Sequence, residues 1–380
     1  MELAFWLAAA VVLYAWIGYP ALIALLAALR PGPAVRRDAI EPSVTVLLAV
    51  RDEEAHLEEK LRGVLALDYP REKLDVLVVS DGSADRTEAI ARGFAGRGVR
   101  LLPLAPPRGK AACLNEGVAH AHGEVLVLTD ARQALDPAAV RRLVACLADP
   151  AVGAVSGELH LLAEPGEATG GVGLYWRYEK LVRRSESRFD STVGVTGALY
   201  ALRRELFVPL DPRAILDDVL VPMEVVLAGR RVVFEPAARA FDRVAESPAR
   251  EYRRKVRTLA GNFQLLALRP ALLDPRRNRL LFQLVSHKLS RLVAPWCLLV
   301  LLAVGAGLAV GRGGALYPAA VGAQALFYAL AFAGALGARR GKVSWLTAAP
   351  YALVLLNVAA ANGLVGFVRG TETAAWKASR

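Results

Sequence analysis

VTVLLAVRDE, residues 44–53, is the stretch that decides the fold of this 380-residue chain. Val44 to Val50 are apolar or β-branched without a break, which predicts a strand that is buried on both faces. Arg51, Asp52 and Glu53 follow at once. In open α/β sheets ligands bind at the carboxyl ends of the strands, so these polar residues mark a candidate site.

The same pattern continues along the chain. We expect strands at 44–50, 74–80, 99–103 and 124–129, alternating with helices at 53–65, 85–94, 110–120 and 137–147. Beyond Val152 the pattern is mixed, with strands expected at 152–159, 194–202 and 231–235 and helices at 175–186 and 218–227. Alternation of this kind predicts the α/β class, with a mainly parallel, Rossmann-like sheet covered by helices.

The chain is too apolar to be only a water-exposed domain, because 55% of its residues are hydrophobic. Four stretches lack charged side chains and are long enough to cross a bilayer: 3–29, 292–310, 315–338 and 343–368. The first could instead be a signal peptide, but it is longer than a signal core and Glu2 replaces the usual positive leader. We therefore divide the chain into an N-terminal transmembrane helix (1–30), an α/β domain (31–249), basic amphipathic interfacial helices (250–291) and three C-terminal transmembrane helices with a tail (292–380).

Basic residues flank these stretches. They are Arg30, Arg36, Arg37, His287, Lys288, Arg291, Arg339, Arg340 and Lys342. By the positive-inside rule these residues are cytosolic, which predicts a multi-pass protein of the cell inner membrane with a cytosolic α/β domain. Although the net charge is +11, the sequence contains no nucleic-acid-binding motif, so we expect no nucleic-acid partner.

Several familiar chemistries are excluded by missing motifs. The chain has no GxxxxGK[ST], no GxGxxG after the first strand, no HExxH and no GxSxG. Three cysteines at 113, 146 and 297 lack the spacing of a zinc site or a disulfide framework. Common NTPases, dehydrogenases, zinc proteases and serine hydrolases are therefore not expected.

Five segments in register resemble the family-2 inverting glycosyltransferases of the GT-A fold, from Val44 to about Gly261. The segments are VTVLLAVRDEE, with Asp52 in place of the family's usual Asn; DGSAD at 81–85; GKAACLNEG at 109–117; DAR at 130–132, where the family has DxD; and Asp217-Asp218. The resemblance extends to membrane-integrated, polysaccharide-synthase-like members. It implies a hexosyl- or N-acetylhexosaminyltransferase that uses a UDP-sugar.

The resemblance also assigns roles in donor binding. Ala49, Arg51 and Glu53 would contact the base and ribose, and Asp81 would accept from the uracil imide. Lys110, at a helix start, would bind the diphosphate. Taken alone, Asp81 could cap a turn, Lys110 could be a solvated lysine, and Glu53 could favour a helix N-terminus.

Asp130 would hold the ribose and, through a divalent cation, the diphosphate. Mg²⁺ or Mn²⁺ suits oxygen ligands and would neutralise the departing diphosphate. Arg132 stands where the second Asp of DxD is expected. A cation would then rely on Asp130, diphosphate oxygens and water, or Arg132 could itself partly neutralise the diphosphate.

Asp218 is the expected general base and Asp217 its neighbour, although an acidic pair can also simply cap a helix. Arg254 and Arg257 fall where processive members carry Q-x-x-R-W, and only Arg257 matches. Both arginines could bind the diphosphate, or the helix could touch anionic lipid. Residues 194–197 could line the acceptor side, or they could be only a strand and a turn.

The sequence thus predicts transfer of a sugar from a UDP-sugar to a polysaccharide or lipid-linked acceptor at the cytosolic membrane face. The alternatives are a single-addition glycolipid synthase, an inactive membrane-anchored nucleotide-sugar sensor, and a transport or structural protein. The last is disfavoured because the apolar stretches contain no charge. Oligomeric state is not predicted.

Overall fold

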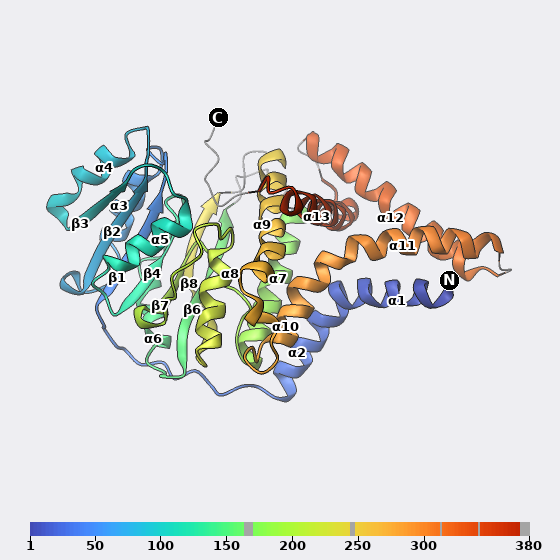
Figure 1. The fold of residues 1–380 in the computed structure, drawn as a ribbon, viewed down its shortest axis with the longest axis horizontal. Coiled ribbons are helices and arrows are strands. Elements are labelled where there is room, and N and C mark those ends of the chain that lie inside the picture. The colour runs from blue at the N-terminus through green and yellow to red at the C-terminus, as the bar shows by residue number, and fades with distance from the viewer. Residues whose placement is uncertain (163–169, 244–247, 312–313, 341–342, 373–380) are drawn as a thin grey trace.

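The computed structural model describes residues 1–162, 170–243, 248–311, 314–340 and 343–372. Figure 1 shows an α/β domain from which three apolar helices project to one side: α1 (Glu2–Leu13), α11 (Ser290–Gly311) and α12 (Leu316–Arg339). Lys342 and the tail beyond residue 372 lie outside the described residues.

One mixed sheet forms the centre of the α/β domain. Its described strands are β1 (Val44–Val50), β2 (Leu74–Asp81), β3 (Val99–Leu104), β4 (Val125–Leu128), β5 (Ala134–Leu135), β6 (Val152–Leu162), β7 (Tyr200–Arg203) and β8 (Arg231–Arg243), in the order β3-β2-β1-β4-β7-β6-β8-β5. Strands β3, β2, β1 and β4 are parallel, and β6 is parallel to β8. Strand β7 runs antiparallel to both β4 and β6, and β5 runs antiparallel to β8. The predicted α/β class with a mainly parallel sheet is confirmed.

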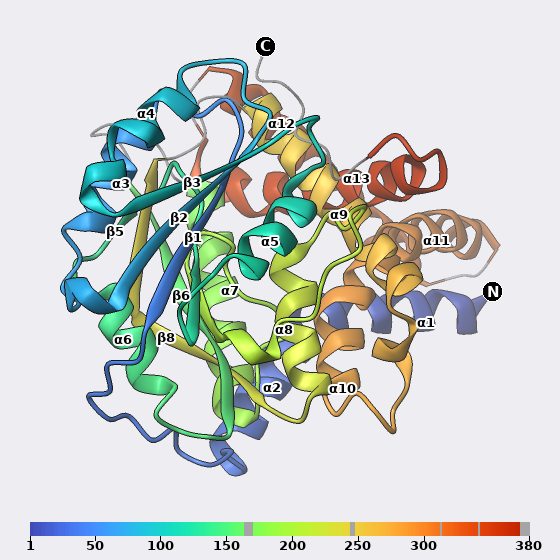
Figure 2. The same cartoon turned by 60° about the vertical axis from the view of Figure 1, so that its left-hand side comes forward.

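Helices cover both faces of the sheet (Figure 2). They are α3 (Leu57–Leu65), α4 (Thr87–Gly93) and α6 (Ala139–Cys146) on one face, and α5 (Lys110–Ala119) and α8 (Asp217–Leu227) on the other. Val46 and Leu48 of β1 face the first set, and Leu47 faces the second, all nearly fully buried. Burial on both faces explains the unbroken apolar run in β1.

Several predicted elements differ from the structure in their bounds; for example, the strand expected at 231–235 extends to Arg243 as β8. The helix expected from Glu53 begins at Leu57, because Asp52 has a φ of 53° and turns the chain. Asp and Asn tolerate this left-handed conformation best, so Asp52 satisfies the requirement met by the family's usual Asn. The strand expected over 194–202 is only Tyr200–Arg203, because 194–199 forms a loop that docks on α8, where the Val195 amide donates to the Asp218 carbonyl at 2.9 Å.

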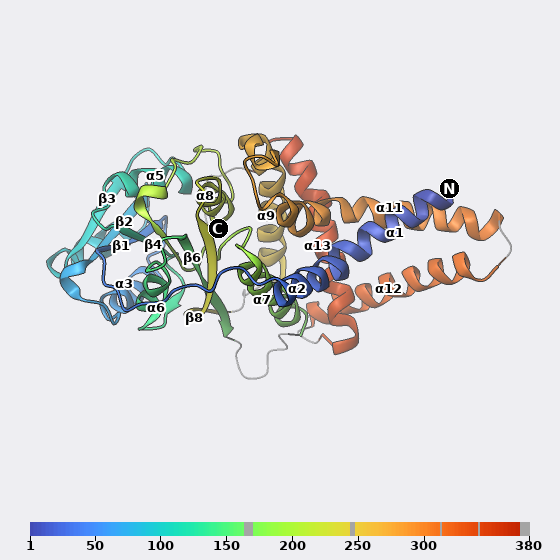
Figure 3. The same cartoon turned by 90° about the horizontal axis from the view of Figure 1, so that it is seen from below.

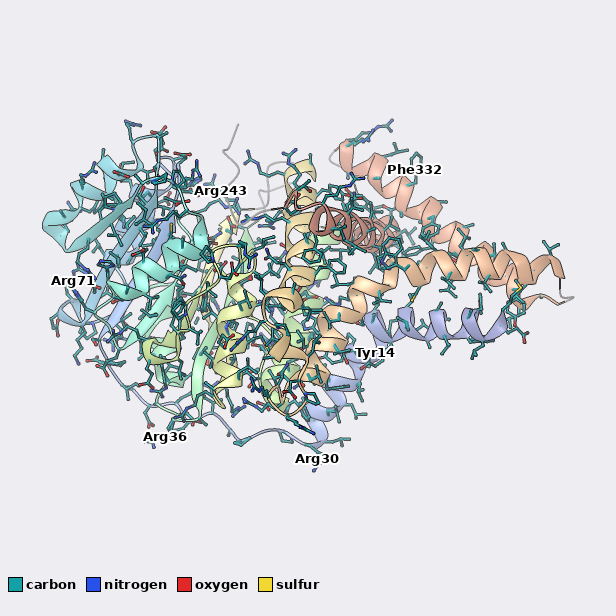
Figure 4. The ribbon with its side chains drawn as sticks, in the orientation of Figure 1. Tyr14, Arg30, Arg36, Arg71, Arg243 and Phe332 are labelled. Atoms are coloured by element: carbon teal, nitrogen blue, oxygen red, sulfur yellow. The ribbon has the colours of Figure 1, made fainter. Side chains whose placement is uncertain are left out.

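Four helices are long and apolar enough to cross a membrane: Glu2–Leu29, Leu281–Gly311, Leu316–Arg339 and Trp345–Val368. They coincide with the four predicted stretches. The first consists of α1, a π-helical stretch (Tyr14–Gly18) and α2 (Tyr19–Leu29). Figure 4 marks Tyr14 where this helix meets the start of the second span, and its hydroxyl lies 2.7 Å from Ser286 Oγ.

Three further helices stand between the sheet and the projecting helices. They are α7 (Gly170–Phe189), α9 (Pro248–Leu268) and α13 (Trp345–Val368). Figure 3 shows α13 crossing α11 and α12 instead of lying alongside them. It packs against α9, where the Phe263 and Phe367 rings stack at 6.2 Å and Asn362 Nδ2 donates to Tyr252 Oη at 2.6 Å.

Shorter elements complete the chain. They are 3-10 turns at Arg71–Lys73, Ala95–Arg97, Arg204–Leu206 and Pro270–Leu273, then α10 (Leu281–Gln283) and a π-helical stretch (Leu284–Leu289) that continues into α11. The predicted interfacial segment 250–291 thus contains most of α9 and the beginning of the second span.

A buried polar network joins the apolar helices to the α/β domain. Tyr19 Oη donates to Glu186 Oε1 at 2.6 Å, and His287 lies between Glu186 (Nδ1 to Oε1, 2.8 Å) and Glu179 (Nε2 to Oε2, 3.2 Å). Arg291 also contacts Glu179. Burial alone would raise the pKa of Glu179, but Arg291 and His287 outweigh it and hold that pKa well below its usual range. The network therefore connects α2, α7 and the start of α11 through buried hydrogen bonds and the ion pair between Arg291 and Glu179.

Candidate active site

One cleft of about 580 Å³ extends from the carboxyl ends of β1 and β4 to α7, α9 and the start of the second span. A volume of a few hundred Å³ is typical of ligand pockets. The predicted site residues that line it are Ala49, Arg51, Glu53, Lys110, Asp130, Asp217, Asp218, Arg254 and Arg257. The loop 194–198 also lines it, and a role of residues 194–197 on the acceptor side stays a prediction.

Lys110 occupies the centre of the sheet end of this cleft. Gly109 has a φ of 89°, which a residue with a side chain rarely adopts, and it places Lys110 at the first position of α5. Lys110 Nζ lies 3.0 Å from Asp130 Oδ1 and 3.3 Å from Asp217 Oδ2. Burial by itself lowers the pKa of Lys110, but Asp130 and Asp217 outweigh burial and raise it. A permanent cation thus stands between two carboxylates, where a diphosphate could replace them.

Asp81 is the predicted site residue that the structure leaves outside the cleft lining. Its side chain is fully buried, and its two carboxylate oxygens accept the amides of Arg108 (2.6 Å) and Gly109 (2.9 Å). In this arrangement Asp81 fixes the loop that leads into Lys110. Its contact with a nucleotide base stays a prediction.

Asp218 is placed as a general base would be. It begins α8 with Asp217 and lines the cleft, and its carboxylate has no hydrogen bond or salt bridge within the described parts of the chain. Burial, and next the charge of Asp217, raise the pKa of Asp218 to about 6, while Lys110, Lys288 and Arg183 oppose this shift. A carboxylate with this pKa accepts a proton more readily than an ordinary one and is still mostly ionised at neutral pH.

Asp130 and Arg132 line the cleft on the turn after β4. The Arg132 guanidinium lies 2.6 Å from Asp242 of β8, so the arginine at the second DxD position already has an acidic partner. The described residues contain no group of three His, Cys, Asp or Glu side chains that could hold a metal. Mg²⁺ commonly binds one or two carboxylates together with substrate phosphates, and the accessible Asp130 carboxylate fits that mode.

Lys60 supports this turn from behind and was not predicted from the sequence. It is 4% exposed, and its Nζ donates to Thr129 Oγ1 and to the Gln133 carbonyl, both at 2.7 Å. Burial lowers its pKa to about 7, opposed by Asp130. A lysine on the buried stripe of α3, with Leu57, Leu61 and Val64, is the sequence feature that could have identified it.

Helix α9 provides one wall of the cleft. Arg254 lies there 2.6 Å from Glu251, and Arg257 lies one turn further along. Asn262 lines the same wall, and its buried Oδ1 has no hydrogen-bond partner in the described chain. Diphosphate binding by Arg254 and Arg257 stays a prediction.

Arg183 of α7 and Lys288, near the start of the second span, line the far end of the cleft. Lys288 belonged to a basic cluster assigned only to membrane topology, and Arg183 was an unremarked position in a predicted helix. Their meeting in one site depends on how α7 packs against the membrane helices, which no local pattern in the sequence encodes.

Comparison with known proteins places these features in context. The family model described as "Glycosyltransferase like family 2" matches residues 42–261. A probable glycosyltransferase, YdaM, of Bacillus subtilis is 27% identical over 255 residues, covering 64% of this chain and 61% of that protein. Poly-beta-1,6-N-acetyl-D-glucosamine synthase of Staphylococcus aureus is 27% identical over 246 residues, covering 63% and 58%. The alignments thus span about three fifths of the length of these relatives.

A solved structure resembles nearly the whole chain. It is a mannosyltransferase from Pyrobaculum calidifontis in complex with GDP-Man and Mn²⁺, 25% identical with a TM-score of 0.73, covering 97% of this chain and 100% of that one. The likeness includes the apolar helices as well as the GT-A-like sheet domain.

Proposed function

Because this chain belongs to glycosyltransferase family 2, we propose that it transfers a hexose or N-acetylhexosamine from a UDP-sugar to a polysaccharide or lipid-linked acceptor, with inversion at the anomeric carbon. The observation that carries this proposal is the convergence of Lys110, Asp130, Asp217 and Asp218 on one cleft, with the Asp218 carboxylate unbound. The apolar helices, with basic residues at their ends, support transfer at the cytosolic face of the inner membrane.

The chemistry follows from the positions of these side chains. Lys110 holds the donor diphosphate at the sheet end of the cleft. Asp218 takes the proton from an acceptor hydroxyl while the oxygen of that hydroxyl attacks the anomeric carbon. The bond from the anomeric carbon to the diphosphate breaks, and the nucleoside diphosphate leaves. Asp217 begins α8 beside the base and lies 3.3 Å from Lys110 Nζ before the donor binds. Attack opposite to the leaving group inverts the anomeric centre.

Asp130 would hold a divalent cation together with the donor diphosphate, and Mg²⁺ or Mn²⁺ there would neutralise charge on the leaving group. The Mn²⁺ in the archaeal mannosyltransferase structure supports this assignment. We expect EDTA to abolish transfer and added Mg²⁺ or Mn²⁺ to restore it. Full activity in EDTA would contradict the metal assignment.

GDP-mannose is a second candidate donor. The archaeal mannosyltransferase that resembles nearly the whole chain was solved with GDP-Man, whereas the synthase relative transfers N-acetylglucosamine by its name and aligns only in part. A UDP-sugar and GDP-mannose share a diphosphate, and they differ in their base and in their sugar. They are therefore distinguished by the base pocket near Ala49, Arg51 and Glu53 and not by Lys110.

The test is turnover of radiolabelled UDP-glucose, UDP-N-acetylglucosamine and GDP-mannose by membranes that contain the full chain. One donor should support transfer, and Asp218→Asn should lower that transfer by about 10² to 10⁴-fold while nucleotide binding is retained. The matched control is Asp211→Asn, since Asp211 pairs with Arg213 outside the cleft.

Each outcome separates the alternatives. Equal turnover by Asp218→Asn and wild type would remove Asp218 as the base. Binding of donor without transfer by the wild type would favour the sensor. Product length decides between repeated and single addition, and the incomplete Q-x-x-R-W match favours single addition.

A further inference from the structure

Two cations at the far end of the cleft lack a direct salt bridge. Arg183 and Lys288 both line the cleft, and neither has a hydrogen bond or a salt bridge in the described parts of the chain. Cations nearer the sheet are paired: Lys110 with Asp130 and Asp217, and Arg132 with Asp242. Charged groups in a cleft without partners are desolvated at a cost, which a ligand of opposite charge offsets.

The nearest carboxylates attract Lys288 through their charge but make no direct salt bridge with it. Glu179 also lines this end of the cleft, but it is occupied by His287 and Arg291. Glu186 is occupied by Tyr19 and His287. The network that fixes these acids therefore leaves Arg183 and Lys288 available to an anion from outside the chain.

The position of Lys288 indicates where that anion comes from. The second span, Leu281–Gly311, has 31 residues, whereas about 20 cross the hydrocarbon core. Lys288 lies near the start of this helix, in the part that exceeds the core, and basic residues at the end of a span lie at the level of the lipid headgroups. Lys288 thus lines the cleft at the end of an apolar helix that is long enough to cross a bilayer.

We infer that Arg183 and Lys288 form a subsite for the phosphate of a lipid-borne acceptor, which enters the cleft from the bilayer. The inference rests on the proposed function and narrows its acceptor to a lipid phosphate. Both cations act on the charge of Asp218, so an anion held by them lies close to the base. Anchoring the acceptor through its phosphate places its reacting hydroxyl beside Asp218, while the lipid chain stays among the apolar helices.

Binding of a short lipid phosphate to the purified full chain in detergent tests this subsite without requiring transfer. Farnesyl phosphate is the probe. Farnesol lacks the phosphate, inorganic phosphate lacks the lipid, and phosphatidylglycerol provides an ordinary headgroup phosphate. The variants are Arg183→Gln, Lys288→Gln and Lys288→Arg. The matched control is Arg184→Gln, since Arg184 neighbours Arg183 on α7 but is 60% exposed and pairs with Glu158.

We expect farnesyl phosphate to bind the wild type at least about tenfold more tightly than the other three probes bind. Arg183→Gln and Lys288→Gln should each weaken it by about tenfold to a hundredfold, the range for losing a charge-assisted hydrogen bond. Arg184→Gln should leave it unchanged, and Lys288→Arg should restore most of it. Retained nucleotide binding by each variant would show that the fold is intact.

The inference is overturned by unchanged farnesyl phosphate binding in both Gln variants. Equal binding of phosphatidylglycerol would make this a site for bulk lipid, and equal binding of inorganic phosphate would make it a site for the free ion; either result removes the acceptor assignment. Failure of the wild type to turn over any donor, with farnesyl phosphate still bound through Arg183 and Lys288, would instead count against the proposed function alone.

Discussion

The two ends of the cleft differ in how their charges are satisfied. At the sheet end, Lys110 already lies between Asp130 and Asp217 at 3.0 and 3.3 Å. At the far end, which we call the membrane end, Arg183 and Lys288 have no salt bridge in the described chain. The sheet end is therefore electrostatically complete before any ligand binds, and a donor must displace existing ion pairs. Among the described residues, the two cations of the membrane end make no direct ion pair, so a ligand would supply the first one.

Removal of His287 should have the largest effect, a loss of folding stability at the membrane end of the cleft. His287→Ala removes the imidazole that bridges the buried carboxylates of Glu179 and Glu186, and leaving a buried polar group without its hydrogen-bond partner costs about 1–3 kcal/mol, more for charged groups. Thermal unfolding in detergent measures this loss. His122→Ala, at an exposed histidine, is the control and should leave the melting temperature unchanged. A melting temperature equal to that of the wild type would mean that the network does not stabilise the junction.

Lys110→Met should impair ligand binding at the sheet end of the cleft and leave the membrane end unchanged. Loss of a charge-assisted contact to the diphosphate weakens donor binding by about tenfold to a hundredfold, and Asp130 and Asp217 are left facing each other. Nucleotide titration measures the change. Lys73→Met, at a lysine that pairs with Glu41 outside the cleft, is the matched control. Farnesyl phosphate binding should be unaffected. If it were lost together with nucleotide binding, the two ends would have to be regarded as a single site.

Lys60→Met should weaken the sheet end indirectly. The ammonium that holds Thr129 and the Gln133 carbonyl disappears, so the turn bearing Asp130 is less well positioned. We expect the turnover number to fall by about tenfold, because removing one partner of a buried hydrogen bond costs about 1–3 kcal/mol. Positioning through the turn predicts a smaller effect on donor binding than on turnover. A pure binding defect would contradict it.

Lowering the pH should have the smallest effect, a gradual loss of transfer activity. The base acts in its ionised form, and the pKa of Asp218 is raised to about 6, so transfer should fall as pH drops through that value. Relative to neutral pH, about half the activity should remain at about pH 6. The ratio kcat/KM for the acceptor over about pH 5–8 measures this, because that ratio follows the pKa of the free enzyme. A flat profile across that acid range would contradict Asp218 as the titrating base.

The sequence predicted the sheet end of the site well because that end follows a local rule. Residues after parallel strands meet at one edge, so Arg51, Asp130 and their partners could be placed together without coordinates. The burial of Asp81 was not predictable, because it depends on the loop at 105–109 folding over the carboxylate. Local pattern also extended one strand to 194–202, whereas Gly194 and Gly197 lie in a loop.

The membrane end was not predictable for a different physical reason. Arg183 and Lys288 lie far apart in sequence and meet only through packing of α7 against the second span. Four apolar stretches could be identified from length and composition alone. Their directions could not, as shown by α13, which crosses α11 and α12 and packs on α9 (Figure 3).

The contacts between Tyr19 and Glu186 and between Tyr14 and Ser286 constrain the order in which the molecule can be completed during synthesis. Ribosomes release the first apolar helix long before residue 281, so Tyr14 lacks its partner until the second helix emerges. Glu186 likewise acquires His287 only then. A fragment that stops short of the second helix therefore retains every described sheet strand and both partners of the Tyr19–Glu186 hydrogen bond, but it lacks Ser286 and His287, the partners of Tyr14 and Glu186.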